Sequence, residues 1–430
     1  MIDNKFNSKL GFVLSAIGGA VGLGNIWMFP YKLQKYGGLF LYTYLLLTFT
    51  VGIVLLSLEF ILGKYFMCDV PRLYKIHAPK IKCVGLLTVL SPLIILMYYC
   101  AAGGMCIKYF FINFFEFFWI DDSFFSYGLT FISTIVFVLL IYIIASKDLN
   151  KGIERFNIIM VPLLMVAIFI WAAILIIRDN SNMILKEIFF IKNEYGIKQV
   201  LEIFAVSAEQ MFFSLSIAVG SMITYGAMMP ANQNTIKSAL SVAVSDTLFA
   251  LAMSVVVISS SISGFSDANG PQLIFNSMQV IFENQGRIGN LLGIFFYAAV
   301  LIAAITSAVS YVEVPISALK NISTLNRKGT LCICIGIVII PAIYITVENF
   351  EAVYNVIVFV SEGVLVPLTA FLTALNFGAL EGKYVIKGFL ACEVQCGYVK
   401  KAFIFILNYL IEFVVITVII AQIIVYINIC

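Results

Sequence analysis

Charge is the scarcest feature of this sequence. Asp, Glu, Lys and Arg make up 11% of the 430 residues, whereas a soluble domain carries about 25%. Histidine occurs once, at His77, and the nine cysteines fall mostly within or beside apolar segments. These shortages exclude a soluble protein and argue against a zinc site or an enzyme, since the sequence shows no metal-ligand cluster and no nucleophile–base spacing. A basic run with interleaved aromatic residues is also missing, so we expect no nucleic-acid partner.

Long apolar runs are what the sequence has instead. Hydrophobic residues account for 62% of the chain, and the mean hydropathy is +1.04. Windows of about 20 apolar residues are long enough to cross a bilayer. They predict eleven spans, near 10–33, 40–64, 86–111, 125–146, 157–177, 203–228, 237–261, 288–318, 330–347, 353–377 and 401–427. We therefore expect an all-α integral membrane protein with one domain over residues 1–430.

Lysine and arginine set the expected orientation. With the N-terminus in the cytoplasm, most of the 26 basic residues fall on the cytoplasmic side of these spans, as the positive-inside rule requires. The first apolar stretch lacks a small-residue cleavage site, so it indicates a spanning helix rather than a signal peptide. We expect a multi-pass protein of the plasma membrane with its C-terminus outside. The polar connections 178–202 and 262–287 are then external and are expected to carry short surface helices.

The first span is interrupted in its middle. Residues 18–30, GGAVGLGNIWMFP, place four glycines, an asparagine and a proline inside an apolar run. Glycine costs about 1 kcal/mol in a helix interior and proline about 3, and lipid offers no partner to the backbone groups that a break frees. Such breaks persist where they line a cavity, and the freed carbonyls and helix ends then hold ions and small charged solutes.

A second interruption lies in span six. Residues 210–226, QMFFSLSIAVGSMITYG, again mix small, polar and apolar residues. Spans one and six are equivalent if residues 10–177 and 203–377 form two five-helix halves of opposite topology, with 401–427 as an additional helix. Paired breaks in corresponding segments indicate the central site of a transporter. The alternative is that the small residues merely let helices pack closely.

Several motifs follow one recognisable pattern. They are GGAVGLGNIW at 18–27, FPY at 29–31, KYGG at 35–38, EFILGKY at 59–65, Tyr98-Tyr99, the 210–226 segment and Thr306-Ser307. Together they resemble the neurotransmitter:sodium symporter family in its bacterial eleven-helix form, over most of spans one to eight. The resemblance implies two inverted five-helix repeats with broken first and sixth helices, an eleventh helix, and alternating access.

The resemblance also implies two sodium sites, with no organic cofactor. The first would be lined by one carbonyl and three side chains, those of Ala20, Asn25, Ser214 and Asp246, with the substrate carboxylate adding an oxygen. The second would combine three carbonyls and two hydroxyls, from Gly18, Val21, Ala303, Thr306 and Ser307. Without the break in span one, the hydroxyls of Thr306 and Ser307 would be expected to bond back to the preceding helical turn.

An amino-acid site is implied between the two breaks. The substrate carboxylate would meet the Tyr99 hydroxyl and the freed amides near Leu23 and Gly24, where the positive end of a half-helix favours an anion. The ammonium would face carbonyls near Ala20 and Phe213. Gly22 stands where monoamine carriers of the family have an aspartate, so it leaves room for a substrate that brings its own carboxylate. The side-chain pocket would be lined by Ile95, Phe213, Ser216, Val219 and Tyr311, which favours a neutral, apolar or aromatic amino acid.

Intramembrane carboxylates are costly and need a reason. Asp246 stands where chloride-dependent relatives often have asparagine, and Ala250 replaces a serine that helps to hold their anion. Our hypothesis is that the Asp246 carboxylate supplies the negative charge beside the first sodium and makes chloride unnecessary. Glu59 is expected to accept amides freed in the sixth helix. For Glu209, Glu313 and Glu362, helix–helix contacts are favoured over substrate contacts.

Both gates depart from the family pattern. The arginine of the outer gate is Met28, and the position of its aspartate partner is assigned to Val358, so this gate is expected to close by apolar contact. At the inner gate, Asn321 replaces an aspartate, and Asp3 lies near the position of the N-terminal arginine.

The sequence as a whole predicts a sodium-coupled symporter that takes up a neutral amino acid by alternating access, independently of chloride. A sodium-conducting channel stays open as an alternative because the gates are altered, and so does a non-transporting amino-acid sensor of the same fold. Expected contacts are the amino acid and membrane lipid, with no obligatory protein partner. Neither the identity of the amino acid nor the ion stoichiometry follows from the sequence.

Overall fold

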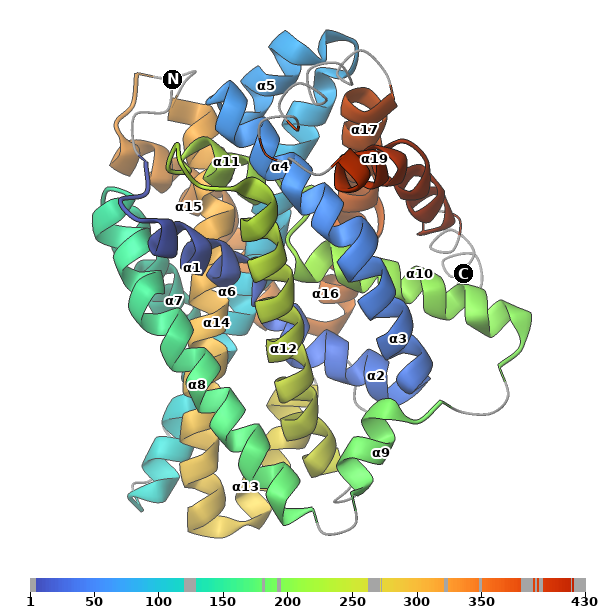
Figure 1. Cartoon of the computed structure of the whole chain (residues 1–430). Helices are drawn as coiled ribbons and strands as arrows, with labels where there is room; N and C mark the ends of the chain where they lie inside the picture. Colours follow the sequence, from blue (N-terminus) through green and yellow to red (C-terminus); the bar gives the residue numbers. More distant parts are fainter. Residues whose placement is uncertain are drawn as a thin grey trace.

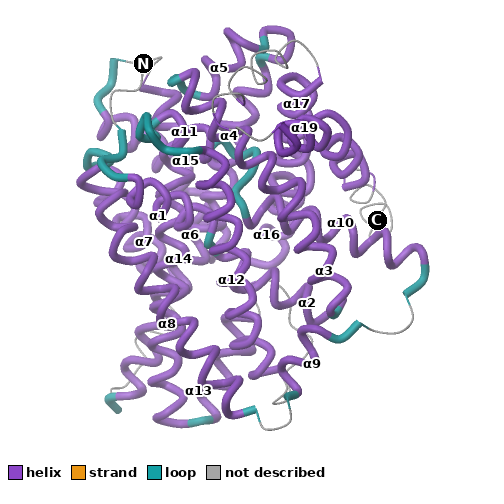
Figure 2. The backbone as a smooth tube through the Cα atoms, viewed as in Figure 1, coloured by secondary structure: helices purple, strands orange, loops and turns teal. Residues whose placement is uncertain are grey.

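The protein is an all-helical bundle in the computed structural model, and no strand occurs among the described residues (Figure 2). The structure describes residues 5–119, 129–179, 182–191, 195–261, 271, 273–320, 324–347, 350–379, 390, 393, 397–418 and 420. Helices α5 (Val70–His77) and α11 (Ser221–Ala227) lie near the end of the bundle that holds the N-terminus, and α9 (Met183–Phe189) and α13 (Gln279–Asn284) lie at the opposite end (Figure 1).

The first half of the chain forms helices with few interruptions. Besides α5, it comprises α1 (Lys9–Ala20), η1 (Gly24–Met28), α2 (Phe29–Tyr36), α3 (Gly38–Leu47), η2 (Thr48–Gly52), α4 (Ile53–Phe66), η3 (Pro79–Ile81), α6 (Cys83–Phe117), α7 (Leu129–Ala145), η5 (Asn150–Glu154) and α8 (Arg155–Arg178).

The second half begins at α9. It continues through α10 (Ile197–Ser214), α11, α12 (Thr235–Ser261), η6 (Leu273–Met278), α13, α14 (Gly286–Lys320), α15 (Arg327–Val347), α16 (Phe350–Val358), η7 (Phe359–Leu365), α17 (Val366–Ala374), η8 (Leu375–Ala379), α19 (Gly397–Phe405) and η9 (Ile406–Leu410).

These helices account for the predicted spans. Within the described residues, eight helices are long and apolar enough to cross a membrane, and α1 with the η1–α2 segment adds a ninth as a pair bent by 55°. The two remaining predicted spans correspond to the shorter apolar helix α7 and to α10 with α11, which are separated by six non-helical residues. The all-α membrane fold with interrupted first and sixth crossings is therefore confirmed.

Hydropathy misplaces the start of the sixth crossing. Helix α10 begins at Ile197 rather than near residue 203, because its first turns carry Lys198, Gln199 and Glu202 and are helical without being apolar. The two long connections contain α9, η6 and α13 as short helices, as predicted. Helix α9 packs on α3, where the Gly38 amide donates to the Phe190 carbonyl at 2.8 Å.

Two long helices form the centre of the bundle. Helices α6 and α14 are each 35 residues long and pack against one another. Helix α4 approaches α11 so closely that a Cβ on Gly63 would lie 2.1 Å from the Ile223 carbonyl oxygen, and one on Gly226 would lie 2.8 Å from the Phe60 carbonyl oxygen. These small residues allow α4 to hold the second part of the sixth crossing against the core.

Candidate functional site

The first crossing breaks where the glycines are. Helix α1 ends at Ala20, and a helical conformation resumes only at Leu23. The side chain of Asn25 turns back into the break, and its Oδ1 accepts from the Gly22 amide at 3.2 Å. The Leu23 amide donates to the Tyr99 hydroxyl of α6 at 3.3 Å. The last carbonyls of α1 have no helical partners, since the helix stops there.

The sixth crossing breaks between Ser214 and Ser221. Ser216, Ala218 and Gly220 have positive φ angles of 50°, 66° and 79°, a conformation that costs a non-glycine residue about 1–3 kcal/mol unless the surroundings hold it. The surroundings do so: the Ala218 amide donates to Glu59 Oε1 at 2.6 Å, and its carbonyl accepts from the Thr369 hydroxyl at 3.0 Å. The predicted bracing role of Glu59 is confirmed for this amide.

The two breaks face each other. The Ser216 hydroxyl donates to the Gly19 carbonyl at 2.9 Å, and the Gln210 amide lies 3.4 Å from the Gly24 carbonyl oxygen. The first bond joins the unwound part of the sixth crossing to the end of α1. Irregular backbone from two crossings is thus brought together inside protein, which is the setting that irregular backbone needs at membrane depth.

Three side chains predicted for the first sodium site form one cluster. Asn25 Nδ2 donates to Ser214 Oγ at 2.9 Å and to Asp246 Oδ1 at 2.8 Å, while Ser214 Oγ donates to Asp246 Oδ2. Tyr44 adds a hydroxyl 3.3 Å from the same carboxylate. The fourth predicted ligand, the carbonyl of Ala20, belongs to the last residue of α1. The Asp246 carboxylate and the Ser214 and Tyr44 hydroxyls are hard oxygen donors, which suit a hard cation. Asn25 turns its Nδ2 toward them and its Oδ1 toward the Gly22 amide.

The residues predicted for the second sodium site also lie together. The Ser307 hydroxyl lies 3.2 Å from the Gly18 carbonyl oxygen and 3.1 Å from that of Val21. The Thr306 hydroxyl bonds back to the Ala303 carbonyl of its own helix at 3.0 Å. This is the back-bonding to the preceding turn that the sequence offered as an alternative. Ser307 instead reaches from α14 to the broken end of α1. The five predicted oxygens therefore form two hydrogen-bonded sets, Thr306 with Ala303 and Ser307 with Gly18 and Val21.

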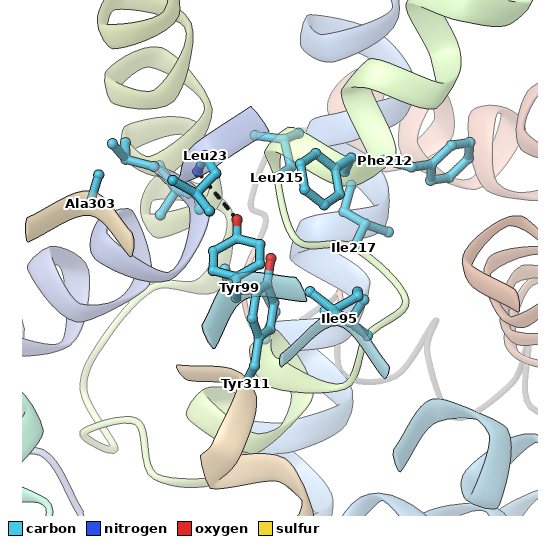
Figure 3. Packing of buried hydrophobic residues seen from close by; sticks show 14 of the residues in the cluster. Leu23, Ile95, Tyr99, Phe212, Leu215, Ile217, Ala303 and Tyr311 are labelled. Carbon is cyan, nitrogen blue, oxygen red and sulfur yellow. Dashed lines mark hydrogen bonds between the residues drawn. The ribbon is translucent and has the colours of Figure 1, made fainter. Parts of the chain in front are cut away.

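The predicted substrate pocket lies beside these two clusters. Tyr99 and Tyr311 point toward Leu23, with Ile95 beside them (Figure 3). The rings of Tyr99 and Tyr311 meet edge to face with centroids 5.4 Å apart, and the Tyr311 hydroxyl lies 3.3 Å from Ser216 Oγ. Hydroxyl groups thus line one part of the pocket and apolar side chains another.

Two glycines in the break are sterically required. A Cβ on Gly22 would lie 2.7 Å from both Ser307 Oγ and the Tyr99 hydroxyl. A Cβ on Gly24 would lie 2.1 Å from Cε1 of Phe213. The hydroxyl groups of two other helices therefore converge on the space where a larger residue at position 22 would carry its side chain.

The whole site is shielded from solvent. The most exposed of the predicted site residues is Phe213, at 6%. On one side, Trp27 packs edge to face against Tyr354 and Phe275, and Tyr354 packs against Tyr98. The residue of α16 that contacts Trp27 in this way is Tyr354, one helical turn before Val358. The assignment of Val358 to the outer gate stays a prediction.

Polar contacts lie near this aromatic cluster. Lys32 pairs with Glu209 at 3.5 Å, and the Tyr98 hydroxyl donates to Glu362. These contacts confirm helix–helix contacts for Glu209 and Glu362. Closure of the outer gate by apolar contact between Met28 and Val358 stays a prediction.

Polar contacts hold the inner side as well. Glu154 accepts hydrogen bonds from the amides of Asn7 and Ser8, at 2.9 and 3.1 Å, and so binds the start of α1 to η5. Arg327 forms a bidentate pair with the buried Glu313, which joins α15 to α14. Asn321 and Asp3, the positions singled out for the inner gate, lie outside the described residues.

One buried amide was missed by sequence reasoning. Asn157 in α8 is 1% exposed, and neither its Oδ1 nor its Nδ2 has a partner within the described structure. Its Oδ1 lies 3.2 Å from the place of a Cβ on Gly18, beside Thr306. The sequence signal that could have found Asn157 is a single amide side chain within an apolar span.

The one histidine, His77, lies in α5 against the Phe66 ring, where burial lowers its pKa and keeps it neutral at pH 7.

Comparisons with known proteins agree with this geometry. The sequence model described as "Sodium:neurotransmitter symporter family" matches residues 3–122. An uncharacterised sodium-dependent transporter of Bacillus subtilis, YhdH, is 30% identical over 437 residues, which cover 95% of this chain and 94% of that protein. The human sodium-dependent neutral amino acid transporter SLC6A17 is 38% identical over 110 residues, 25% of this chain and 15% of that protein.

A solved structure is similar over nearly the whole chain. The crystal structure of MhsT in complex with L-phenylalanine superposes with a TM-score of 0.86 at 26% sequence identity, covering 98% of this chain and 100% of MhsT.

Proposed function

This chain belongs to the sodium:neurotransmitter symporter family, whose members are sodium-coupled transporters, and on that basis we propose that it couples sodium entry to the uptake of a neutral amino acid. The observation that carries the proposal is the meeting of two interrupted crossings, joined by the bond from Ser216 to the Gly19 carbonyl. Carboxylate, amide and hydroxyl oxygens lie around that junction. The phenylalanine complex of MhsT supports an apolar or aromatic substrate.

The proposed substrate pose follows from the polarity of the pocket. The substrate carboxylate would lie near Gly22, where the Tyr99 and Ser307 hydroxyls converge, and would face the amides of Leu23 and Gly24. Its ammonium would face the carbonyls near Ala20 and Phe213. The predicted side-chain pocket, lined by Ile95, Phe213, Ser216, Val219 and Tyr311, supports an uncharged side chain because its members are apolar or carry only hydroxyls.

Two sodium ions are proposed as co-substrates. The first would take the place of the hydrogen bonds that now join Asn25, Ser214 and Asp246. The second would lie between the Gly18 and Val21 carbonyls, which the Ser307 hydroxyl contacts, and the Thr306 hydroxyl and Ala303 carbonyl of α14. Because the substrate carboxylate lies next to the first site, ion and substrate would stabilise each other, which is the reciprocal coupling that symport needs.

Chloride independence is part of the proposal. Asp246 already carries a negative charge beside the first site, and Ala250 offers no hydroxyl to an anion. Sodium-driven uptake by the unmodified protein is expected to be unchanged when gluconate replaces chloride.

Topology is proposed on the same basis. Residues 10–177 and 203–377 would be the inverted repeats and 401–427 the additional helix, within one transporter domain over residues 1–430. The N-terminus would be cytoplasmic and the C-terminus outside. Breaks in the first crossing of each repeat support this division, as does the distribution of Lys and Arg.

The function is tested by a ligand screen with the purified full chain. Each of the twenty amino acids is added in sodium and in potassium, and the unfolding midpoint is measured. A ligand at 100 times its Kd stabilises the protein by about 2.7 kcal/mol. We expect one or a few neutral amino acids to raise the midpoint in sodium only. Stabilisation that is equal in potassium would contradict sodium coupling, and unitary currents without substrate would indicate a channel instead.

Tyr99→Phe tests the substrate pose. Loss of a hydrogen bond to a charged group costs about 1.5–3 kcal/mol, so KM for uptake is expected to rise about tenfold or more. Tyr98→Phe is the matched control, because the Tyr98 hydroxyl bonds to Glu362 rather than to the break. Equal changes in KM for the two variants would contradict the assignment.

Ser307→Ala tests the second sodium site. The variant loses the side-chain oxygen that contacts both the Gly18 and the Val21 carbonyls. The sodium concentration for half-maximal uptake is expected to rise about tenfold, since each contact to a cation contributes about 1.5–3 kcal/mol. Ser310→Ala, whose hydroxyl only bonds back to the Ser307 carbonyl at 2.8 Å, should leave sodium dependence unchanged. A normal sodium titration of Ser307→Ala would remove this residue from the site.

A further inference from the structure

A cavity outside the transport site lies at the turn between α7 and α8. Its volume is about 190 Å³. Three of its lining residues are basic and the others are mostly apolar: Lys147, Lys151, Arg155, Ile144, Gly152, Phe156, Ile159 and Met160. A cavity with this composition offers a charged rim above an apolar wall.

The three basic side chains are available for a ligand. Lys147, Lys151 and Arg155 are exposed, and within the described part of the chain none of them makes a side-chain hydrogen bond or ion pair. Two acids are near in sequence: Glu154 is already bonded to the backbone of Asn7 and Ser8, and Asp148, which does not line the cavity, interacts with Arg327. Three cations that share one cavity without a carboxylate partner favour an anion.

The apolar wall faces the lipid. Ile159 lies one helical turn beyond Arg155 on the same face of α8 and is 55% exposed, and Leu163, one turn further, is 54% exposed. The basic residues therefore stand at the edge of an apolar helix surface that continues into the membrane. This order, charge first and then hydrocarbon, matches the order of groups along a phospholipid.

The cavity lies at the end of the bundle where α1 begins, because η5 is bonded to Asn7 and Ser8. With a cytoplasmic N-terminus, this is the level of the inner leaflet, whose anionic lipids attract basic residues near its surface. We propose that the cavity binds one anionic phospholipid, with its phosphate held by Lys147, Lys151 and Arg155 and its acyl chains lying along Ile159 and Leu163.

The position of this lipid gives it a route to the transport cycle. Gly152 lines the cavity, and Glu154, two residues further on in η5, holds the start of α1. A lipid that fixes η5 would therefore stabilise the contact that keeps the inner side closed.

The test uses the full chain, purified and delipidated in a neutral detergent. Mixed micelles that contain phosphatidylglycerol are expected to raise its unfolding midpoint, whereas phosphatidylcholine micelles and soluble glycerol 3-phosphate are not. In the variant Lys147→Gln/Lys151→Gln/Arg155→Gln, the apparent affinity for phosphatidylglycerol is expected to fall tenfold or more, since each basic residue near the surface contributes about fivefold. A variant with Arg72→Gln, Lys75→Gln and Lys82→Gln removes the same charge on exposed residues elsewhere and should bind as the unmodified chain does.

Two results would overturn the proposal. Equal losses in both triple variants would show diffuse attraction to a basic surface, and stabilisation by glycerol 3-phosphate alone would show a site for a soluble anion. If the triple variant does not fold, the single variants Lys147→Gln and Arg155→Gln are measured instead. Each is expected to lose about fivefold in apparent affinity for phosphatidylglycerol. Normal binding by both would refute the proposal.

Discussion

Asp246→Ala is expected to reduce sodium-driven uptake at least a hundredfold. The carboxylate is fully buried and bonded to Asn25, Ser214 and Tyr44, so its removal takes the only formal negative charge from these four side chains. Breaking a buried charged pair costs about 3–5 kcal/mol, and about 2.8 kcal/mol already corresponds to a hundredfold loss of sodium affinity. Uptake of a labelled substrate into proteoliposomes under an inward sodium gradient measures the effect.

Asp246→Asn separates the charge from the shape. The amide fills the same space without the charge, so a mobile anion can replace it, and uptake is expected to become dependent on chloride. Adding Ala250→Ser supplies a nearby hydroxyl and should lower the chloride concentration needed. If uptake by Asp246→Asn does not depend on chloride, Asp246 does not take the place of chloride. Chloride dependence of the unmodified protein would also contradict this role.

Gly22→Ala is expected to abolish uptake with little loss of folded protein. Its added methyl carbon would lie 2.7 Å from Ser307 Oγ and from the Tyr99 hydroxyl, and both groups are assigned to ligand binding. Both atoms lie at the far ends of side chains, so small side-chain shifts can relieve the contact and keep the fold, but they displace two groups assigned to the ligands. The methyl group also occupies the proposed place of the substrate carboxylate, so a fall in uptake of at least a hundredfold is expected.

Gly336→Ala is the matched control for this substitution. Gly336 lies in the spanning helix α15, and no atom lies within 4 Å of the place of its Cβ. Uptake by Gly336→Ala should equal that of the unmodified chain, and alanine at this helical position should stabilise the helix rather than strain it. Normal uptake by Gly22→Ala would show that the substrate lies elsewhere.

The two breaks could be predicted from the sequence, whereas the contacts that close the site could not. Small and polar residues in an apolar span indicate a break by local rules alone: α1 ends at Ala20 within its glycine-rich run, and α10 ends at Ser214, where the mixed segment 214–220 begins. The partners of Glu209 and Glu313 were not predictable, because Lys32 and Arg327 lie on other helices and become neighbours only through packing.

What the sequence by itself determined is the all-helical membrane class, the two interrupted crossings and the residue types at each predicted ligand position. These follow from hydropathy and backbone propensity, which act over a few neighbouring residues. Only the tertiary structure decided that Ser307 reaches α1 while Thr306 bonds back within its own helix, and that Glu154 holds the start of α1. Such choices depend on how helices far apart in the chain are rotated against one another, and that rotation is set by the packing of the whole bundle.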